Sequence, residues 1–390
     1  MKNKVLSLGS GNRVFIGEVI FCIAFAMLLT IRLSNWSVNG GFMMYLGGTF
    51  RRILLIGIAV LLAVKGIFFQ RMKLGWRAAA LIIVALMYLT YYQTGDYTVL
   101  ALASFIVCGQ GVRVRSLSKV YAAIGTAWTL INAILVMAGK IENYVYYRGD
   151  TPRYAMGYVN PNTFALIICG ICIAWCVITW GKKFYTDFAV IAIGIYFCYF
   201  VANSRTFALS LVILAVFIAV QHFIKNRFVI KICVIAMAAI AALVILSSFF
   251  FMLFYTEDNA LFVKINSALN ERPMLANLCY EAYGLNIFGR DYSGLPELWN
   301  GYSFLVDNIF CYVLLNFGLV AAVLFIAGLV IFYWDAIRRS EWGICLVGIT
   351  MFVIIGFTEN IGITFEMDYF LIAFSGLIFK EPVDSIKRIS

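Results

Sequence analysis

The sequence predicts an all-α membrane protein, a polytopic bundle of about twelve spanning helices. Of its 390 residues, 63% are apolar and 13% are charged, whereas roughly 25% of the residues in soluble domains are charged. Apolar stretches of about 17–25 residues recur along the chain, and each can cross about 30 Å of hydrocarbon. Most of the net charge of +11 lies in short loops between these stretches. These loop charges therefore determine the orientation of the chain in the membrane and do not indicate nucleic acid binding.

The chain is expected to form a single transmembrane domain over residues 1–390. The first stretch is interpreted as a retained helix, because no small-residue cleavage site follows it. The expected spans are Val14–Leu33, Ile53–Phe69, Arg77–Tyr92, Thr98–Val112, Val120–Gly139, Pro161–Trp180, Thr186–Ala202, Thr206–Phe223, Val229–Tyr255, Ser303–Trp334, Trp342–Thr358 and Ile363–Phe379. The tenth is long enough to include an interfacial helix, and the twelfth is barely long enough to span.

The distribution of basic residues predicts the orientation. With the N terminus inside, about two-thirds of the Lys and Arg residues face the cytoplasm, as the positive-inside rule expects. Both termini are then cytoplasmic, and the long loops 140–160 and 256–302 lie outside. Ten basic residues fall on the outer side: Arg32, Arg51, Arg52, Lys140, Arg148, Arg153, Arg205, Lys264, Arg272 and Arg290. Positive charge on this side calls for an anionic partner, for which a lipid-linked phosphate or diphosphate is the obvious choice.

The end of the first long loop has the composition of an anion site. Asn160 is a good N-cap and Pro161 suits the first helical position, so the sixth span should begin there with its N terminus facing outward. Unpaired N–H groups and the helix dipole at such an end favour an anion. Arg148 and Arg153 lie immediately before this start, and Asn162 lies just after it. The competing interpretation is a well-capped helix whose arginines contact lipid headgroups.

A second outward helix start carries Ser204-Arg205, between the seventh and eighth spans. Guanidinium groups suit phosphate because they remain charged and offer two parallel hydrogen bonds. Two such starts, each with arginine, predict a diphosphate clamp. The loop 256–302 adds Arg272 and Arg290 as further cations.

Carboxylates for proton transfer also lie on the outer side. Asp307, at the outer end of the tenth span, is the first choice for a base, and Glu281 and Asp291 are alternatives. No metal site is expected. Cys169, Cys172 and Cys176 lie inside an apolar span, and Glu366 and Asp368 are two residues apart and would face different directions on a helix. The single histidine, His222, is expected to be structural, and no cofactor motif is present.

These segments resemble, in the same order, the O-antigen polymerase and ligase family of bacterial membrane proteins. The resemblance covers residues 148–390. It rests on Arg153…Gly157…Asn160-Pro161-Asn162, on Ser204-Arg205, on Glu271-Arg272 followed by Phe288-Gly289, and on Asp307-Asn308…Gly318. It implies a GT-C-like glycosyltransferase with twelve helices and no metal, acting on the outer face of the bacterial cytoplasmic membrane. Ligases of this family carry a histidine near the position of Asp307-Asn308, so its absence here favours polymerase over ligase.

For a polymerase, the resemblance implies that undecaprenyl-diphosphate-linked repeat units serve as donor and acceptor. Candidate protein partners are a flippase and a chain-length regulator. Arg153 and Arg205 are then expected to bind the diphosphate, and Asp307 to accept the proton. The alternatives are an O-antigen-ligase-like transferase and a flippase for lipid-linked oligosaccharides. A flippase would be expected to show inverted repeats and charges between the two faces, but no internal repeat is evident and the charges gather on one face.

Overall fold

The computed structural model of the chain describes residues 10–38, 47–70, 72, 74–299, 301–340, 342–360 and 363–379. Within these ranges the chain is mostly helical. Nine of the described helices are long and apolar enough to cross a membrane. Three shorter apolar helices, Thr98–Val107, Ile344–Gly356 and Tyr369–Ile378, coincide with the fourth, eleventh and twelfth expected spans. The all-helical membrane class is thus confirmed, and the count of twelve spans stays a prediction.

The chain divides into two compact units, each built from segments that are distant in sequence. The first contains residues 1–73, 105–215 and 378–390, and the second contains residues 74–104 and 216–377. Residues 1–9 and 380–390 lie outside the described ranges, so the cytoplasmic location of both termini stays a prediction. The single transmembrane domain expected from the sequence is likewise neither confirmed nor contradicted.

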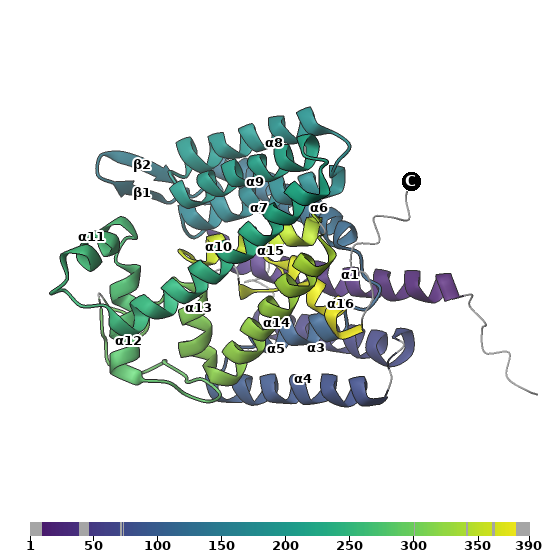
Figure 1. The fold of residues 1–390 in the computed structure, drawn as a ribbon. Helices are drawn as coiled ribbons and strands as arrows, with labels where there is room; N and C mark the ends of the chain where they lie inside the picture. The colour runs from purple at the N-terminus through teal and green to yellow at the C-terminus, as the bar shows by residue number, and fades with distance from the viewer. Residues whose placement is uncertain are drawn as a thin grey trace, which may run out of the picture. The chain divides into compact units, whose positions relative to one another are not determined.

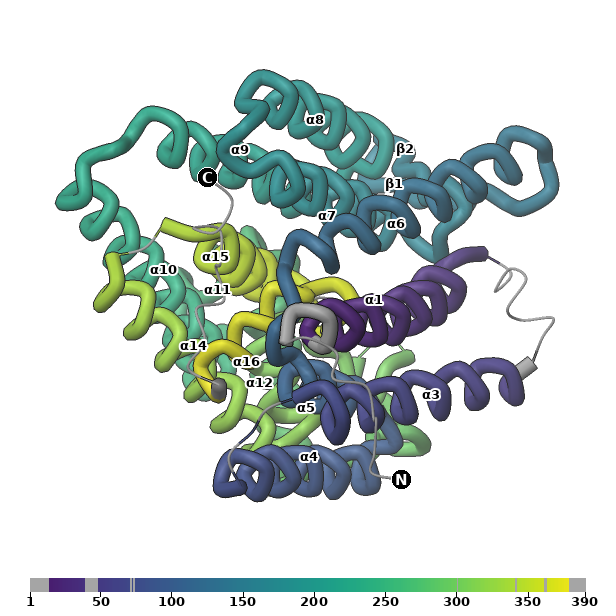
Figure 2. The backbone as a smooth tube through the Cα atoms, turned by 90° about the vertical axis from the view of Figure 1, so that its right-hand side faces the viewer, coloured from purple at the N-terminus to yellow at the C-terminus, as the bar shows by residue number. Residues whose placement is uncertain are grey.

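In the first unit, α7 lies between α6 and α8 and is the most deeply buried of the long helices. Figure 1 shows the short hairpin β1–β2 at one end of these helices. In Figure 2, α1 and α3 lie side by side. The elements are α1 (Ser10–Asn35), α3 (Gly47–Val64), the π-helix η2 (Lys65–Phe69), α6 (Val114–Met137), β1 (Val145–Arg148), β2 (Thr151–Tyr154), α7 (Pro161–Thr179), α8 (Phe184–Tyr196) and the π-helix η3 (Phe197–Val201).

The second unit is organised around α10, which packs against α12 and α15. Its elements are α4 (Leu74–Thr94), α10 (Arg227–Phe254), α11 (Ala260–Ala268), α12 (Arg272–Tyr283), α13 (Ile309–Tyr312), the π-helix η4 (Val313–Phe317), α14 (Gly318–Arg339), α15 (Ile344–Gly356), the 3-10 helix η6 (Tyr369–Ile372) and α16 (Ala373–Phe379). Three helices contribute residues to both units: α5 (Thr98–Val107), α9 (Arg205–Phe223) and α16, whose last two residues belong to the first unit.

Several helix ends lie up to six residues from the expected bounds, as at the starts of α3 and α6, and three further features differ from the expected spans. The loop after α6 contains an antiparallel hairpin, which the sequence interpretation omits. The tenth helical segment begins at Ile309 and not at Ser303, because the Asn308 side chain caps it there. The last segment is not one continuous helix: Thr364, Glu366 and Asp368 are buried in a non-helical stretch that precedes η6. Polar side chains at this density disfavour an uninterrupted apolar helix.

The helix that runs from Ile309 to Arg339 is broken at Gly318, whose φ of +87° and ψ of 176° are not helical. Backbone groups freed by this break pair with the loop that precedes the helix. The Arg290 amide donates to the Asn316 carbonyl, and the Leu319 and Val320 amides donate to the carbonyls of Asn286 and Ile287. We call residues 286–290 the splint, because their backbone satisfies the hydrogen bonds that the helix lacks.

Candidate functional site

The hairpin β1–β2 positions the two arginines of the loop between α6 and α7. Its register pairs Tyr146 with Arg153 and Arg148 with Thr151. Since directly paired residues share a face and side chains alternate along a strand, these four side chains lie on one face. Three of them reach loop backbone on that side: Tyr146 donates to Val159, Arg148 to Asn203 and Arg153 to Ala202. The hairpin therefore presents both guanidinium groups to the loop before α9.

Arg153 is bound at two points. Its Nε donates to the Ala202 carbonyl at 3.0 Å, and a terminal nitrogen donates to Asn162 Oδ1 at 2.6 Å. Arg148 reaches the Asn203 carbonyl at 3.3 Å. These acceptors are neutral carbonyl and amide oxygens, and they orient the guanidinium groups. Both arginines are half-buried, a setting that strengthens their attraction for an anion compared with full exposure.

Asn160 and Pro161 form the start of α7 as the sequence predicts. Asn160 has extended backbone geometry, its Oδ1 accepts from the Thr163 amide at 2.8 Å, and Pro161 occupies the first turn. Asn162 follows in the same turn and holds Arg153, so the capped helix end and the guanidinium are linked by one hydrogen bond. The helix dipole and the first unpaired amides add positive potential at this end.

Arg205 is the first residue of α9 and is exposed. It lies two residues after Asn203 and three after Ala202, whose carbonyls accept from the hairpin arginines. Within the described part of the chain, no hydrogen bond or ion pair is formed by the Arg205 side chain. Three arginines and two helix starts therefore gather around residues 202–205 in the first unit, and we call this set the arginine cluster: Arg148, Arg153, Arg205, Asn160 and Asn162.

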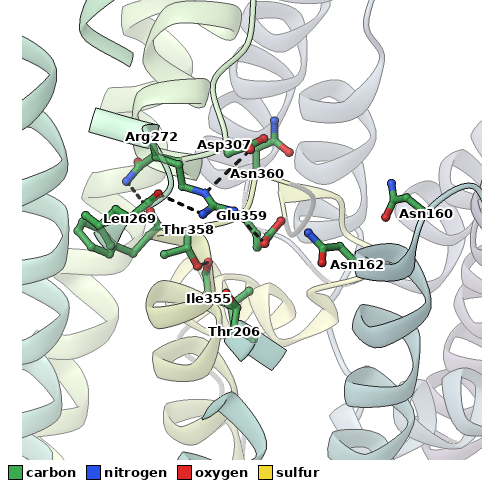
Figure 3. Close-up of polar contacts among 12 residues, drawn as sticks. Asn160, Asn162, Thr206, Leu269, Arg272, Asp307, Ile355, Thr358, Glu359 and Asn360 are labelled. Carbon is green, nitrogen blue, oxygen red and sulfur yellow. Dashed lines mark hydrogen bonds and ion pairs between the residues drawn. The ribbon is translucent and has the colours of Figure 1, made fainter. Parts of the chain in front are cut away.

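Arg272 in the second unit has a different environment. Figure 3 shows its guanidinium between the carboxylates of Glu359 and Asp307. One terminal nitrogen donates to Glu359 Oε1 at 3.1 Å and the other to the Leu269 carbonyl at 3.2 Å, while Nε lies 3.9 Å from Asp307 Oδ2. With two carboxylates around one cation, these three groups carry a net charge of about −1 when ionised. Arg272 is therefore already charge-compensated and is a poorer diphosphate ligand than the arginine cluster.

The Asp307 side chain is partly buried but still accessible at the protein surface. Its side chain is 37% exposed, compared with 6% for Glu359 and 11% for Arg272. Burial raises the pKa of Asp307 above its ordinary value, and the charge of Arg272 opposes that rise. A carboxylate with a raised pKa that can still be reached by a hydroxyl group suits a general base. The next residue, Asn308, is firmly held: its side chain caps α13 and donates to Ser248 and Phe357.

The other predicted site residues of the second unit do not join Arg272 and Asp307. Glu281 is exposed near the end of α12, nine residues after Arg272, which is about 14 Å along a helix. Asp291 is exposed and accepts from the Ser293 amide, which lowers its pKa and identifies it as a turn residue. Arg290 stacks over the Tyr283 ring at 5.9 Å. Of the three predicted carboxylates, only Asp307 lies beside a buried cation.

A small cavity of about 20 Å³ adjoins Arg272, and its volume suffices for one water molecule. Its lining residues come from α10, α12, α13 and the segments that flank them: Ser248, Phe251, Leu269, Arg272, Pro273, Ala276, Asn308, Cys311 and Phe357. Among the described residues, no group of three or more His, Cys, Asp or Glu side chains is placed to hold a metal ion.

Two features of the site are missing from the sequence interpretation. The hairpin had a readable signal, because Gly149-Asp150 separates two short runs rich in β-branched and aromatic residues. The pairing of Arg272 with Glu359 had none. These residues are 87 positions apart, and the sequence places Glu359 only near the outer end of a late helix.

Comparisons of the chain with known protein families, with curated proteins and with solved structures find no match.

Proposed function

We propose that this protein is a polysaccharide polymerase that joins undecaprenyl-diphosphate-linked repeat units on the outer face of the bacterial cytoplasmic membrane. The arginine cluster carries this proposal. Arg148 and Arg153, held by backbone and amide oxygens, lie beside two helix starts, an arrangement that suits a diphosphate, and the apolar helices suit its lipid tail. In this proposal the chain is a GT-C-like glycosyltransferase that needs no metal.

The proposed reaction is a single glycosyl transfer. A sugar hydroxyl of the acceptor attacks the anomeric carbon of the donor glycan, a new C–O bond forms, and the bond from that carbon to the diphosphate breaks. Undecaprenyl diphosphate departs with the electron pair, and the hydroxyl proton passes to a carboxylate. Arg153, Arg205 and Arg148 stabilise the charge that develops on the leaving group. Asp307 is assigned the role of base because it is the accessible carboxylate whose pKa burial raises.

The test uses purified full-length protein in lipid nanodiscs, a synthetic undecaprenyl-diphosphate repeat unit and EDTA, followed by gel separation of the glycans. We expect a ladder with one-repeat spacing. Arg153→Ala and Arg205→Ala should each reduce its formation by about 100-fold or more, because preorganised donors act on the developing charge. Arg339→Ala is the matched control, since Arg339 pairs with Asp335 at the C-terminal end of α14.

Two results would overturn the proposal. One is the absence of a ladder with several matched repeat units in folded protein, and the other is an unchanged ladder in both arginine variants. A deletion strain separates this reaction from transport. Single repeat units should accumulate on the outer leaflet if polymerisation is lost, and on the inner leaflet if the protein is a flippase.

A further inference from the structure

Arg272 lies closer to Glu359 than to Asp307. Its terminal nitrogen makes a 3.1 Å hydrogen bond to Glu359 Oε1, whereas Nε lies 3.9 Å from Asp307 Oδ2, which is too long for a hydrogen bond. Nε is buried, and it has no hydrogen-bond partner within the described residues. A donor left in this state is costly, and Asp307 could satisfy it by moving about 1 Å. Some other contact must therefore hold the guanidinium back.

We propose that Glu359 is a positioning residue that keeps the Arg272 guanidinium within ion-pair distance of Asp307 but outside hydrogen-bond distance, so that the Asp307 carboxylate remains free to accept a proton. This inference deepens the proposed function and rests on it for the identity of the proton donor, an acceptor hydroxyl. Glu359 is itself buried, three residues after the end of α15, and does not touch the reacting atoms in this assignment.

The residues around Asp307 and Glu359 support the assignment of Asp307 as base and Glu359 as positioning residue. Arg272 is the charged group that acts on the pKa of Asp307, which burial raises and Arg272 lowers. Asp307 and Glu359 are the acidic groups within ion-pair distance of Arg272 in the described part of this unit. The adjoining segments contribute neutral groups: the Leu269 carbonyl takes one Arg272 donor, and the amides of Asn308 and Asn360 donate to the backbone of Phe357 and Val306. Arg272 thus links Glu359 to Asp307.

This geometry predicts in which direction the pKa of Asp307 changes when either partner is replaced. When Glu359 loses its charge, Arg272 turns its full charge to Asp307, and the pKa of Asp307 falls. When Arg272 loses its charge, the same pKa rises. If Glu359 were only a structural anchor, its removal would let Arg272 swing away, and the pKa of Asp307 would rise or stay unchanged.

The experiment measures protonation of Asp307 without requiring activity. The full-length protein in nanodiscs is labelled with a carbodiimide and an amine between pH 4 and 8, because carbodiimides react with protonated carboxyl groups, and the label on Asp307 is quantified by peptide mass spectrometry. The labelling midpoint should fall by roughly half a pH unit in Glu359→Gln and rise by about one unit in Arg272→Gln. An unchanged or raised midpoint in Glu359→Gln overturns the proposal.

Two further measurements make the labelling test independent of the folding of one variant and of polymerase activity. Glu359→Asp retains the charge but withdraws it by one methylene, so a lower midpoint is also expected there if Glu359→Gln fails to fold. Where the wild-type protein makes polymer, the acid limb of its pH–rate profile should shift in the same direction as the midpoint. If no polymer forms under any condition, the proposed function fails, while the labelling still decides the role of Glu359.

Discussion

Single residues in this protein act through long-range partners. Glu18 on α1 is 6% exposed and binds residues about 95 positions away: its carboxylate accepts from the Arg113 amide, from the Arg113 guanidinium and from the Ser116 hydroxyl. These bonds connect α1 to the start of α6. The pattern matches that of Arg272 and Glu359, in which the chemistry of each residue is visible in the sequence and the partner is not.

Removal of the Glu18 carboxylate should weaken the first unit. Because the Arg113 side chain is 55% exposed and can be hydrated, we expect Glu18→Ala to lower the free energy of unfolding by about 1–3 kcal/mol. Asp335→Ala is the comparison, since it breaks an exposed pair on one helix and should cost less than about 1 kcal/mol. Unfolding in detergent measures both, and equal losses would show that the Glu18 contacts add nothing beyond a surface pair.

At the level of elements, glycine decides where the splint can meet the broken helix. Gly289 has a φ of +82°, and a Cβ on it would overlap the Asn316 carbonyl oxygen. Gly289 and Gly318, which belong to two separate motifs of the resemblance, thus have a structural reason here, because both glycines permit close approach of two backbones.

A pair of alanine substitutions separates steric overlap from backbone strain. Gly294 has a similar φ of +79°, with nothing within 4 Å of an added Cβ. We expect Gly294→Ala to cost about 1–2 kcal/mol from left-handed strain alone, and Gly289→Ala to cost roughly 1–3 kcal/mol more from overlap. The measurement is the thermal midpoint of the purified protein. Similar midpoints for the two variants would mean that the splint can move away without penalty.

Local sequence signals predicted the start of α7 correctly. Asn160-Pro161 carries its own capping chemistry, and α7 begins where that chemistry places it. The start of the tenth segment was predicted six residues too early, because apolar residues before Asn308 extend the hydropathy signal beyond the cap. The last segment was misjudged for a related reason: averaged hydropathy hides three buried polar side chains.

At the scale of the whole molecule, composition and hydropathy predicted the membrane class. The arginine cluster was partly predictable, since its arginines lie close to capped helix starts in the sequence. Its assembly depends on hydrogen bonds over 49 and 55 positions, and no local pattern encodes those. Charge sharing around Arg272 likewise arises only when α12 and the end of α15 are brought together.

The predicted orientation can be tested over the whole chain with introduced cysteines. Asp150 at the hairpin tip and Lys182 after α7 are both exposed. A membrane-impermeant maleimide should label Asp150→Cys in intact cells and Lys182→Cys only after the membrane is opened. The native cysteines, all buried or half-buried, provide a low background, and the parent protein measures it. The reverse labelling pattern would invert the topology and move the arginine cluster to the cytoplasmic side.

The splint also has a consequence for the order of assembly during synthesis. A chain emerges from the ribosome with its N-terminal end first, so residues 286–290 are made before residues 313–320. The backbone that satisfies the broken helix is therefore already present when the break enters the bilayer. A helix interrupted in hydrocarbon needs such partners at once, because no water is available there to replace them. The amides and carbonyls that the break at Gly318 leaves without helical partners can therefore pair with residues 286–290 before any later part of the chain is made.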